Sequence, residues 1–319
     1  MRDAMIGLLA AAAAAAWLPA HAQQYPSKPV RVIVSTVPGP LDAFVRIVAG
    51  KMGERLKQNF VVENRPGAGG NIAAEAVAKA PPDGYTLLFA IDTTFTVNPS
   101  MYRRLPFDPD RDFATISVPV TYTQMLAVHP SVPAKSAKDL VALARRQKLT
   151  YASGGNGTPS HLAMALFLNE AGIDMTHVPY KGTGQSVIDV VGGQVDSIFA
   201  VVTGVNPHVQ NGRLRGLGVS SVQRSQLAPD IPTIRESGYP KFDASFAYAL
   251  MAPAGTPEPI IQALSREVAW ALAQADVQEK NRIADYVPTG LDPKASGQFL
   301  RETRGRLAVI INKAGIRVD

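Results

Sequence analysis

The residues with the clearest chemical role lie in a glycine-rich segment in the middle of the chain. A predicted strand ends at Tyr151, and Thr158 followed by Pro159 is typical of a helix start, because Thr caps helices well and Pro fits the first turn. Free backbone N–H groups at such a turn, with the positive end of the helix dipole behind them, attract anions. The pattern therefore predicts an anion site formed by Ser153, Gly154, Gly155, Asn156, Gly157 and Thr158. An ordinary glycine-rich turn is an equally good interpretation of this segment alone.

Two other loops follow predicted strands and precede predicted helices in the same way. The first is residues 35–41, followed by Asp42, which is either a helix cap or a partner for an ammonium or hydroxyl group of a ligand. The cap is the better interpretation of the sequence alone. The second loop, residues 180–183, offers the Tyr180 hydroxyl and the Lys181 ammonium group, although Lys181 is also explained as a solvated surface residue.

Motifs for catalysis or metal binding do not stand out in this sequence. The chain contains no Gly-x-Ser-x-Gly, His-Glu-x-x-His or Walker A pattern, and residues 67–70 lack the glycine spacing of a dinucleotide site. A pair of Ser153 with His161 would lack the third member of a catalytic triad. We therefore expect no enzyme activity, no cofactor and no metal site. The histidines outside the N-terminal segment show no metal-ligand spacing: they are His129, His161, His177 and His208.

The elements that must position these loops alternate between strand and helix. Apolar runs predict strands over residues 30–34, 60–63 and 85–90, and helical spacing predicts helices over 44–56 and 72–79 between them. This order is typical of parallel βαβ units, so we expect an α/β fold. Ligands of such sheets bind beyond the carboxyl ends of the strands, where the three loops lie. The remaining predicted strands are 121–128, 150–151, 176–178, 195–199, 214–220 and 246–251, and the remaining helices are 136–145, 160–171, 185–191, 259–275 and 295–314.

Composition and the N-terminal segment indicate export from the cytoplasm. Arg2, an apolar run over residues 6–18 and the small residues around Ala22 predict a secretory signal peptide over residues 1–22. The apolar run is shorter than the about 20 residues of a membrane-spanning helix. The 319 residues include no cysteine, so neither a disulfide framework nor a lipid anchor is expected, and the periplasm is the favoured location. The net charge of +6 comes without a basic stripe, which argues against nucleic acid as a partner.

Several segments, in order along nearly the whole mature chain, are similar to the Bug-type receptors, the periplasmic solute-binding proteins of tripartite tricarboxylate transporters. The similar segments are residues 25–29 (YPSKP), 62–71 (VENRPGAGGN), 82–88 (PDGYTLL), 97–102 (VNPSMY), 151–162, 177–182 (HVPYKG), 232–238 (PTIRESG) and 252–257 (APAGTP).

This resemblance implies the two-lobed type II periplasmic binding architecture, in which each lobe is a mostly parallel sheet flanked by helices. Lobe one would comprise residues 24–124 and 244–319, and lobe two residues 125–243, with a hinge between them. The family's ligands are small carboxylates held mainly by backbone amides, hydroxyls and waters, and its partners are the membrane subunits of the transporter. We expect a monomer. The implied ligand-binding residues are Ser35, Thr36, Gly39, Asp42, Thr93, Ser153, Gly154, Gly155, Asn156, Gly157, Thr158, Tyr180, Lys181, Gly182, Thr183 and Ala200.

Two departures from the family pattern bear on the ligand. The first loop is one residue shorter than usual and lacks one glycine, and Pro40 has no N–H group to offer. Ala200 stands where relatives often carry Asp, so a partner for an ammonium or hydroxyl group is missing. Both changes argue against amino acids and favour a plainer or more apolar acid. The alternatives to a transport receptor are a sensor that docks on a signalling protein and, on weaker grounds, an enzyme on the same fold.

Overall fold

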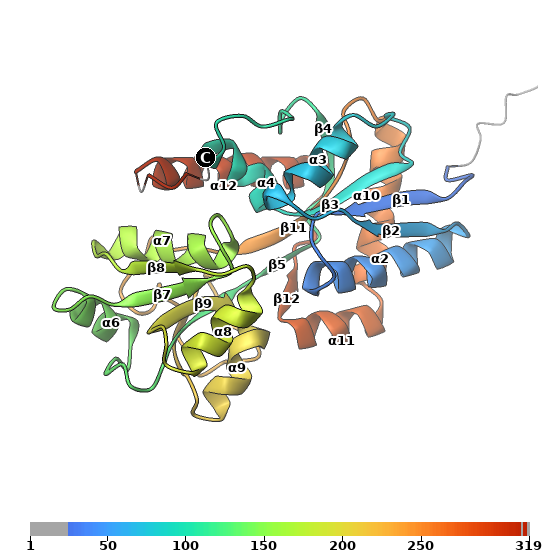
Figure 1. The fold of residues 1–319 in the computed structure, drawn as a ribbon. Helices are drawn as coiled ribbons and strands as arrows, with labels where there is room; N and C mark the ends of the chain where they lie inside the picture. Colours follow the sequence, from blue (N-terminus) through green and yellow to red (C-terminus); the bar gives the residue numbers. More distant parts are fainter. Residues whose placement is uncertain (1–24, 314, 318–319) are drawn as a thin grey trace, which may run out of the picture.

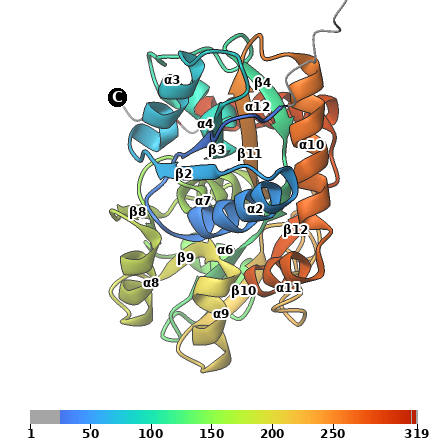
Figure 2. The same cartoon turned by 90° about the vertical axis from the view of Figure 1, so that its right-hand side faces the viewer.

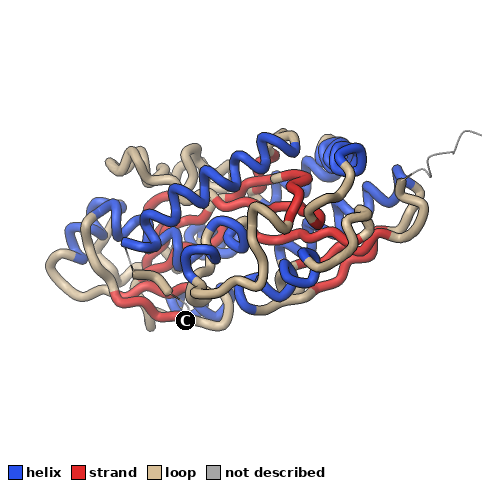
Figure 3. The backbone as a smooth tube through the Cα atoms, turned by 90° about the horizontal axis from the view of Figure 1, so that it is seen from above, coloured by secondary structure: helices blue, strands red, loops and turns tan. Residues whose placement is uncertain are grey.

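The computed structural model describes residues 25–313 and 315–317 and folds into two lobes, each built on its own β-sheet (Figure 1). The predicted signal peptide lies outside the described residues. Figure 3 shows the strands running through the middle of an elongated molecule, with helices on either side of them.

Lobe one contains a seven-stranded sheet with the order β12-β5-β11-β3-β1-β2, in which β4 also pairs with β11. Successive side chains along its strands point to opposite faces of the sheet, and both faces are packed. Val32 and Val34 of β1 lie in one apolar cluster, and Ile33 between them lies in another. The strands are β1 (Val30–Val34), β2 (Phe60–Asn64), β3 (Thr86–Ile91), β4 (Phe113–Ser117), β5 (Val120–Tyr122), β11 (Phe246–Pro253) and β12 (Tyr286–Pro288).

The helices of lobe one cover both faces of this sheet. Helices α2 and α10 pack on one face, whereas α3, α4 and α12 pack on the other. They are α2 (Pro40–Leu56), α3 (Asn71–Ala78), α4 (Thr93–Thr96), α5 (Asn98–Met101), α10 (Glu258–Leu272), α11 (Ala275–Ala284) and α12 (Pro293–Lys313), with a short 3-10 turn, η1 (Ala68–Gly70), before α3.

Lobe two contains a five-stranded sheet with the order β10-β6-β9-β7-β8. Its strands are β6 (Gln124–Val128), β7 (Thr150–Ser153), β8 (Thr176–Pro179), β9 (Ser197–Val201) and β10 (Arg215–Val219). Its helices are α6 (Ala137–Ala144), α7 (Pro159–Ala171), α8 (Thr183–Val191) and α9 (Val202–Gln210). Helix α6 begins as its sequence predicts, because the Ser136 hydroxyl accepts a hydrogen bond from the Asp139 amide at 3.1 Å.

The expected α/β architecture with two lobes is confirmed, but the strand pairing is mixed. Among the described strands, parallel pairs join β1 to β2 and β3, and β7 to β8 and β9. The neighbours of β11 and of β6 run antiparallel to them. Strands β11 and β6 enter their sheets directly from the other lobe, without the crossover helix that a parallel pair requires.

The apolar run over residues 121–128 is two strands in two different sheets rather than one strand. The chain passes from β5 to β6 at Thr123, and it returns to lobe one through residues 220–245. The two crossings are tied together, since the Thr123 hydroxyl lies 3.1 Å from the Ser220 hydroxyl and accepts the Ser221 amide at 3.0 Å. A hinge at this place remains a prediction.

Helix α2 begins at Pro40, earlier than the predicted start around Asp42, and Gly39 is its N-cap residue. Pro fits this first helical position because it needs no N–H partner there. The sequence pattern predicts no element at β4, α4, α5, α9, α11 or β12. Helix α9 contains Pro207, and the other five elements are short or lack a regular apolar face.

Candidate functional site

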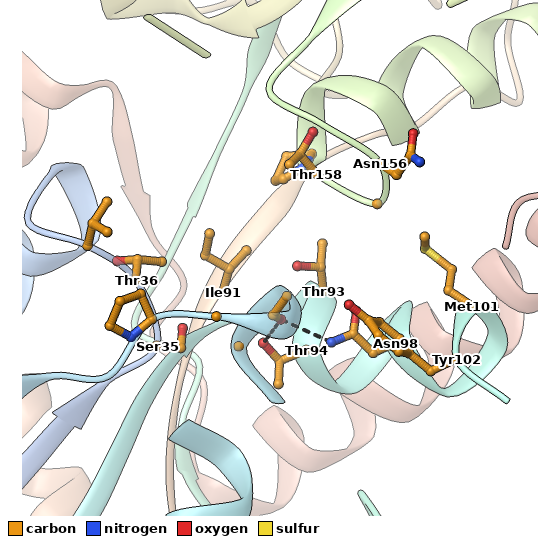
Figure 4. A pocket seen from close by; sticks show the side chains of 17 residues that line it. Ser35, Thr36, Ile91, Thr93, Thr94, Asn98, Met101, Tyr102, Asn156 and Thr158 are labelled. Carbon is orange, nitrogen blue, oxygen red and sulfur yellow. Dashed lines mark hydrogen bonds between the residues drawn. The ribbon is translucent and has the colours of Figure 1, made fainter. Parts of the chain in front are cut away.

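A cavity of about 260 Å³ lies between the lobes, at the carboxyl ends of β1, β2 and β3 (Figure 4). Lobe one supplies three walls from the loops after these strands, and lobe two supplies the tip of the loop between β7 and α7. The lining residues are Ser35, Thr36, Val37, Pro66, Gly67, Gly69, Gly70, Ile91, Thr93, Thr94, Asn98, Met101, Tyr102, Asn156, Gly157, Thr158 and Pro159.

The floor of the cavity is a tight glycine turn in lobe one. Gly69 and Gly70 have φ values of 63° and 94°, which only glycine adopts easily. A Cβ atom on Gly70 would lie 2.5 Å from the Thr94 hydroxyl, so this position also has no room for a side chain. The Gly69 carbonyl accepts hydrogen bonds from the Thr94 hydroxyl at 3.1 Å and from the Asn98 amide at 3.0 Å. These bonds hold the turn against α4 and α5.

The polar groups that line the cavity are neutral. No described Lys, Arg, Asp or Glu side chain lines it. The hydroxyls of Thr36 and Thr93 form no hydrogen bond to another described residue, so they are available to a bound molecule. Such hydroxyls, together with backbone amides, stabilise a carboxylate by hydrogen bonds rather than by an ion pair.

The loop from lobe two differs from the predicted anion cradle in one important respect. The amides expected to be free are bonded within the loop: Gly154 to the Ser160 hydroxyl at 2.9 Å, Gly155 to the Ser153 hydroxyl at 3.1 Å, and Gly157 to His161 Nδ1 at 3.1 Å. The expectation of free N–H groups at these three glycines is therefore wrong in this structure. Two serine hydroxyls and one imidazole nitrogen satisfy these amides instead.

Thr158 is the N-cap residue of α7 and Pro159 begins the helix, as predicted. The Thr158 hydroxyl does not cap the helix. It donates to the Gly155 carbonyl at 2.7 Å and lies 3.0 Å from the Ser160 hydroxyl. Figure 4 shows Asn156 and Thr158 on the opposite side of the cavity from Thr36, Thr93 and Asn98.

Two stacked imidazole rings lie beside this loop. The rings of His161 and His177 are parallel, with centroids 4.2 Å apart, and Tyr151 stacks on His177 at 4.8 Å. Burial and the neighbouring His177 lower the pKa of His161 to about 4, which keeps its Nδ1 atom an acceptor for the Gly157 amide. Ser153 lies 2.6 Å from His177 Nε2, so its histidine partner is not His161.

The other predicted contact residues lie outside the lining of this cavity. The Tyr180 hydroxyl donates to Asp189 at 2.7 Å, and burial followed by this bond raises the pKa of Tyr180 to about 12. Gly154 and Gly155 pack against residues 180–183, because Cβ atoms there would approach the Thr183 hydroxyl to 2.8 Å and the Tyr180 carbonyl to 2.9 Å. Lys181 is exposed, and Gly182 is the N-cap residue of α8.

Asp42 and Ala200 also take structural positions. Asp42 bonds to Arg46 at 2.9 Å instead of capping α2, and this bond lowers the pKa of its carboxyl group. Ala200 is fully buried in β9, opposite Met125 of β6. Ser35, Thr36, Thr93, Asn156, Gly157 and Thr158 are the predicted residues that the structure brings together around the cavity.

The sequence argument missed the glycine turn and α5 as parts of the site. Gly67, Gly69, Asn98 and Tyr102 line the cavity, and all four lie in segments that resemble the Bug-type receptors. The signal for Gly67 and Gly69 was the glycine-rich loop after a strand, which has the same strand–loop–helix order as the cradle, whereas Asn98 and Tyr102 lie outside that loop.

Gly157 brings the two lobes into direct contact at the cavity. Its φ is 73°, and a Cβ atom on it would lie 2.7 Å from Met101 Cε and 3.0 Å from Met101 Sδ. Met101 ends α5 in lobe one, so this glycine allows the loop of lobe two to approach lobe one closely. Figure 4 shows Met101 and Thr93 on the lobe one side of this approach.

Two further features of the described chain bear on its chemistry. Within the described residues, no cluster of three or more His, Asp or Glu side chains has the arrangement of a metal site. None of the described helices has the length and apolar character needed to cross a membrane.

Residues 44–316 match the family model described as "Tripartite tricarboxylate transporter family receptor". The chain is 33% identical to the Bordetella pertussis protein BugT over 319 residues, which covers 99% of this chain and 98% of BugT.

Among solved structures, Rpa4515 of R. palustris with adipate superimposes with a TM-score of 0.83 at 31% identity, covering 92% of this chain and all of that one. MatC of Rhodopseudomonas palustris with bound malate gives a TM-score of 0.79 at 30% identity, covering 90% of this chain and all of that one. The motif resemblance is thereby confirmed over nearly the full length. The chain belongs to the receptor family of the tripartite tricarboxylate transporters, the Bug-type solute-binding proteins.

Proposed function

We propose that this protein is a periplasmic receptor that captures a small organic carboxylate between its lobes and delivers it to the membrane subunits of a tripartite tricarboxylate transporter. The observation that carries the proposal is the cavity between the lobes, with unengaged threonine hydroxyls on one side and the β7–α7 loop on the other. Relatives solved with adipate and malate support a carboxylate as the ligand class.

The ligand would be held by neutral donors. Ser35, Thr36 and Thr93 would donate to it from lobe one, and Asn156 from lobe two. Asn98, Gly157 and Thr158 shape the cavity, since their donors are bonded within the protein. Each hydrogen bond to a charged group contributes about 1.5–3 kcal/mol. Four such bonds, less the costs of ordering and closure, permit a binding free energy of about −8 kcal/mol, which corresponds to a micromolar Kd. Val37, Ile91 and Met101 add apolar contacts, which suit an acid with an apolar body.

Lobe closure would be the event that the transporter recognises. The two crossings at Thr123 and Ser220 are the proposed hinge, and the approach of Gly157 to Met101 is the contact made when the lobes close. Export to the periplasm, the signal peptide over residues 1–22 and the monomeric state are parts of the same proposal.

A thermal-shift screen over mono-, di- and tricarboxylates and acidic amino acids tests the ligand class. At about 100 times Kd, a ligand of the folded state adds about 2.7 kcal/mol, which raises Tm by several degrees in a protein of this size. We expect a shift with a carboxylate and a smaller one with its amino-substituted analogue. If no carboxylate moves the Tm, the proposed ligand class is wrong.

A further inference from the structure

His161 bonds to the wall that lobe two contributes to the cavity, although its own side chain does not line the cavity. It lies in the first turn of α7, and both Figure 1 and Figure 2 show this helix on the side of lobe two that faces lobe one. Its Nδ1 atom accepts a hydrogen bond from the Gly157 amide at 3.1 Å. Gly157 lines the cavity, so this bond joins the wall of the cavity to the helix behind the loop.

The bond to Gly157 determines where the proton of the His161 ring lies. A backbone N–H can only donate, so Nδ1 carries a lone pair and the neutral ring has its proton on Nε2. A protonated imidazole, by contrast, donates from both nitrogen atoms. Protonation would therefore set an N–H group of the ring against the N–H group of Gly157 and end the bond. Only the neutral ring can hold the loop.

The neighbours of His161 fix the orientation of its ring and disfavour a charge on it. The ring is parallel to that of His177 on β8, with centroids 4.2 Å apart, and Tyr151 of β7 stacks on His177 at 4.8 Å. In the described part of the chain, no Asp, Glu, Lys or Arg side chain forms an ion pair or hydrogen bond with either imidazole. Burial and the neighbouring His177 lower the pKa of His161 to about 4, so the ring is neutral at pH 7.

The Gly157 amide links His161 to the groups that would meet the ligand. Asn156, directly before Gly157, is the side chain of lobe two that would donate to the carboxylate. Gly157 itself makes the close approach to Met101 of lobe one. A change in the conformation of Gly157 would therefore displace both a ligand donor and the contact between the lobes. Binding is tightest when such groups are held in place before the ligand arrives.

We propose that His161 is a positioning residue of the binding site. Its neutral imidazole holds Gly157, and with it Asn156, in the conformation that receives the ligand, and protonation of the ring releases this wall of the cavity. His177 contributes by fixing the orientation of the ring and by disfavouring its protonation. The effect on the ligand rests on the proposed function, whereas the state of the loop can be measured without any ligand.

Amide NMR of the ligand-free mature protein tests the proposal. His161→Asn and His161→Leu are a matched pair, because both replace the ring by a branched group of similar size and only asparagine has an acceptor as close to Cβ as Nδ1 is. At pH 7 we expect amide hydrogen exchange at Gly157 to be about tenfold faster than wild type in His161→Leu and within about threefold of wild type in His161→Asn, since one hydrogen bond is lost only in the former. The Gly192 amide, bonded to the Ile188 carbonyl at 2.9 Å, is the control and should exchange alike in all three proteins.

A pH titration of the wild type needs no variant to fold. Between pH 7 and pH 4, the chemical shift of the Gly157 amide should change with the same midpoint as the His161 imidazole, well below pH 6.5, while the Gly192 amide keeps its shift. In His161→Asn the Gly157 amide should show no such change. A Gly157 amide that does not follow the titration of His161, or equal exchange rates at Gly157 in the two variants, would overturn the proposal.

Adipate, with which the relative Rpa4515 was solved, is the probe for the effect on binding. By isothermal titration at pH 7, we expect a Kd about tenfold weaker in His161→Leu and within about twofold of wild type in His161→Asn. Equal affinities of all three proteins would refute the positioning role. If the wild type does not bind adipate, that result counts against the proposed function alone, because the ligand-free amide measurements still decide whether His161 holds the loop.

Discussion

Replacing Gly157 with Ala is predicted to weaken ligand binding without contacting the ligand. The added Cβ atom would lie 2.7 Å from Met101 Cε and 3.0 Å from Met101 Sδ, whereas ordinary carbon contacts are about 3.5–4.0 Å. Met101 belongs to lobe one and Gly157 to lobe two, so the clash arises only when the lobes approach each other. The substitution therefore favours a more open arrangement.

The size of the affinity loss follows from two energetic costs of the substitution, backbone strain at residue 157 and the clash with Met101. The φ of 73° costs a residue with a Cβ atom about 1–2 kcal/mol, but this cost is present in open and closed forms and cancels in the binding equilibrium. The clash does not cancel. Overpacking by one methyl group costs about 1–3 kcal/mol, and the lower half of this range applies because methionine is flexible. An affinity loss of about tenfold is expected.

Gly172→Ala is a matched control for the backbone strain. Gly172 has a φ of 62°, and a Cβ atom on it would meet no atom within 4 Å. By isothermal titration with the carboxylate found in the screen, we expect Gly157→Ala to bind about tenfold more weakly and Gly172→Ala to bind normally, although both lower the Tm. In a Met101→Ala background the effect of Gly157→Ala should shrink. Equal affinities of Gly157→Ala and the wild type would refute the closure contact.

Three further predictions concern stability. Burial raises the pKa of Asp92 to about 7, so the stability that its protonated form contributes is lost as the pH rises from about 4 to 7. In urea unfolding at pH 8, Asp92→Asn should be more stable than the wild type, by at most about 4 kcal/mol. A difference that stays constant at all pH values would contradict this. The lowered pKa of His161, about 4, means that the wild type loses stability as the pH falls from 6.5 to about 4. His161→Gln should lose less stability over this range, the difference being at most about 3 kcal/mol. Parallel curves of Tm against pH for the two proteins would disprove it. Gly154→Ala should lower the free energy of unfolding by about 1–3 kcal/mol, because its Cβ atom would lie 2.8 Å from the Thr183 hydroxyl, whereas Gly184→Ala meets no atom within 4 Å and should not; equal losses would count against the packing argument.

Much of the fold could be predicted from local pattern. The alternation of apolar strands with amphipathic helices gave the α/β class, and Ser136 and Pro159 mark helix starts where the structure has them. The division of residues 121–128 between two sheets could not be predicted, because an unbroken apolar run fits one strand as well as two. Only the pairing of β5 with β11 and of β6 with β9 shows that the chain changes sheets at Thr123.

The candidate site was predictable in its location and less so in its chemistry. The rule that ligands bind beyond the carboxyl ends of strands indicated three loops, and two of them, residues 35–41 and the β7–α7 loop, contribute to the cavity lining, whereas residues 180–183 do not. Thr93, which also lines the cavity, was implied by the family resemblance instead. The hydrogen bonds of the loop amides were not predictable, since their acceptors include a side chain in the first turn of α7, His161, whose direction depends on the conformation of the glycine loop. The part of α5 in the site has no local signal, because Asn98 acts through its bond to Gly69, which is distant in sequence.

A crystal structure with the carboxylate from the screen tests the central claim most directly. The account predicts electron density for the acid between the lobes, with its oxygens near Thr36 and Thr93 on one side and the loop of Gly157 and Thr158 on the other. Density for the acid only elsewhere on the molecule, with this cavity holding none of it, would contradict the account.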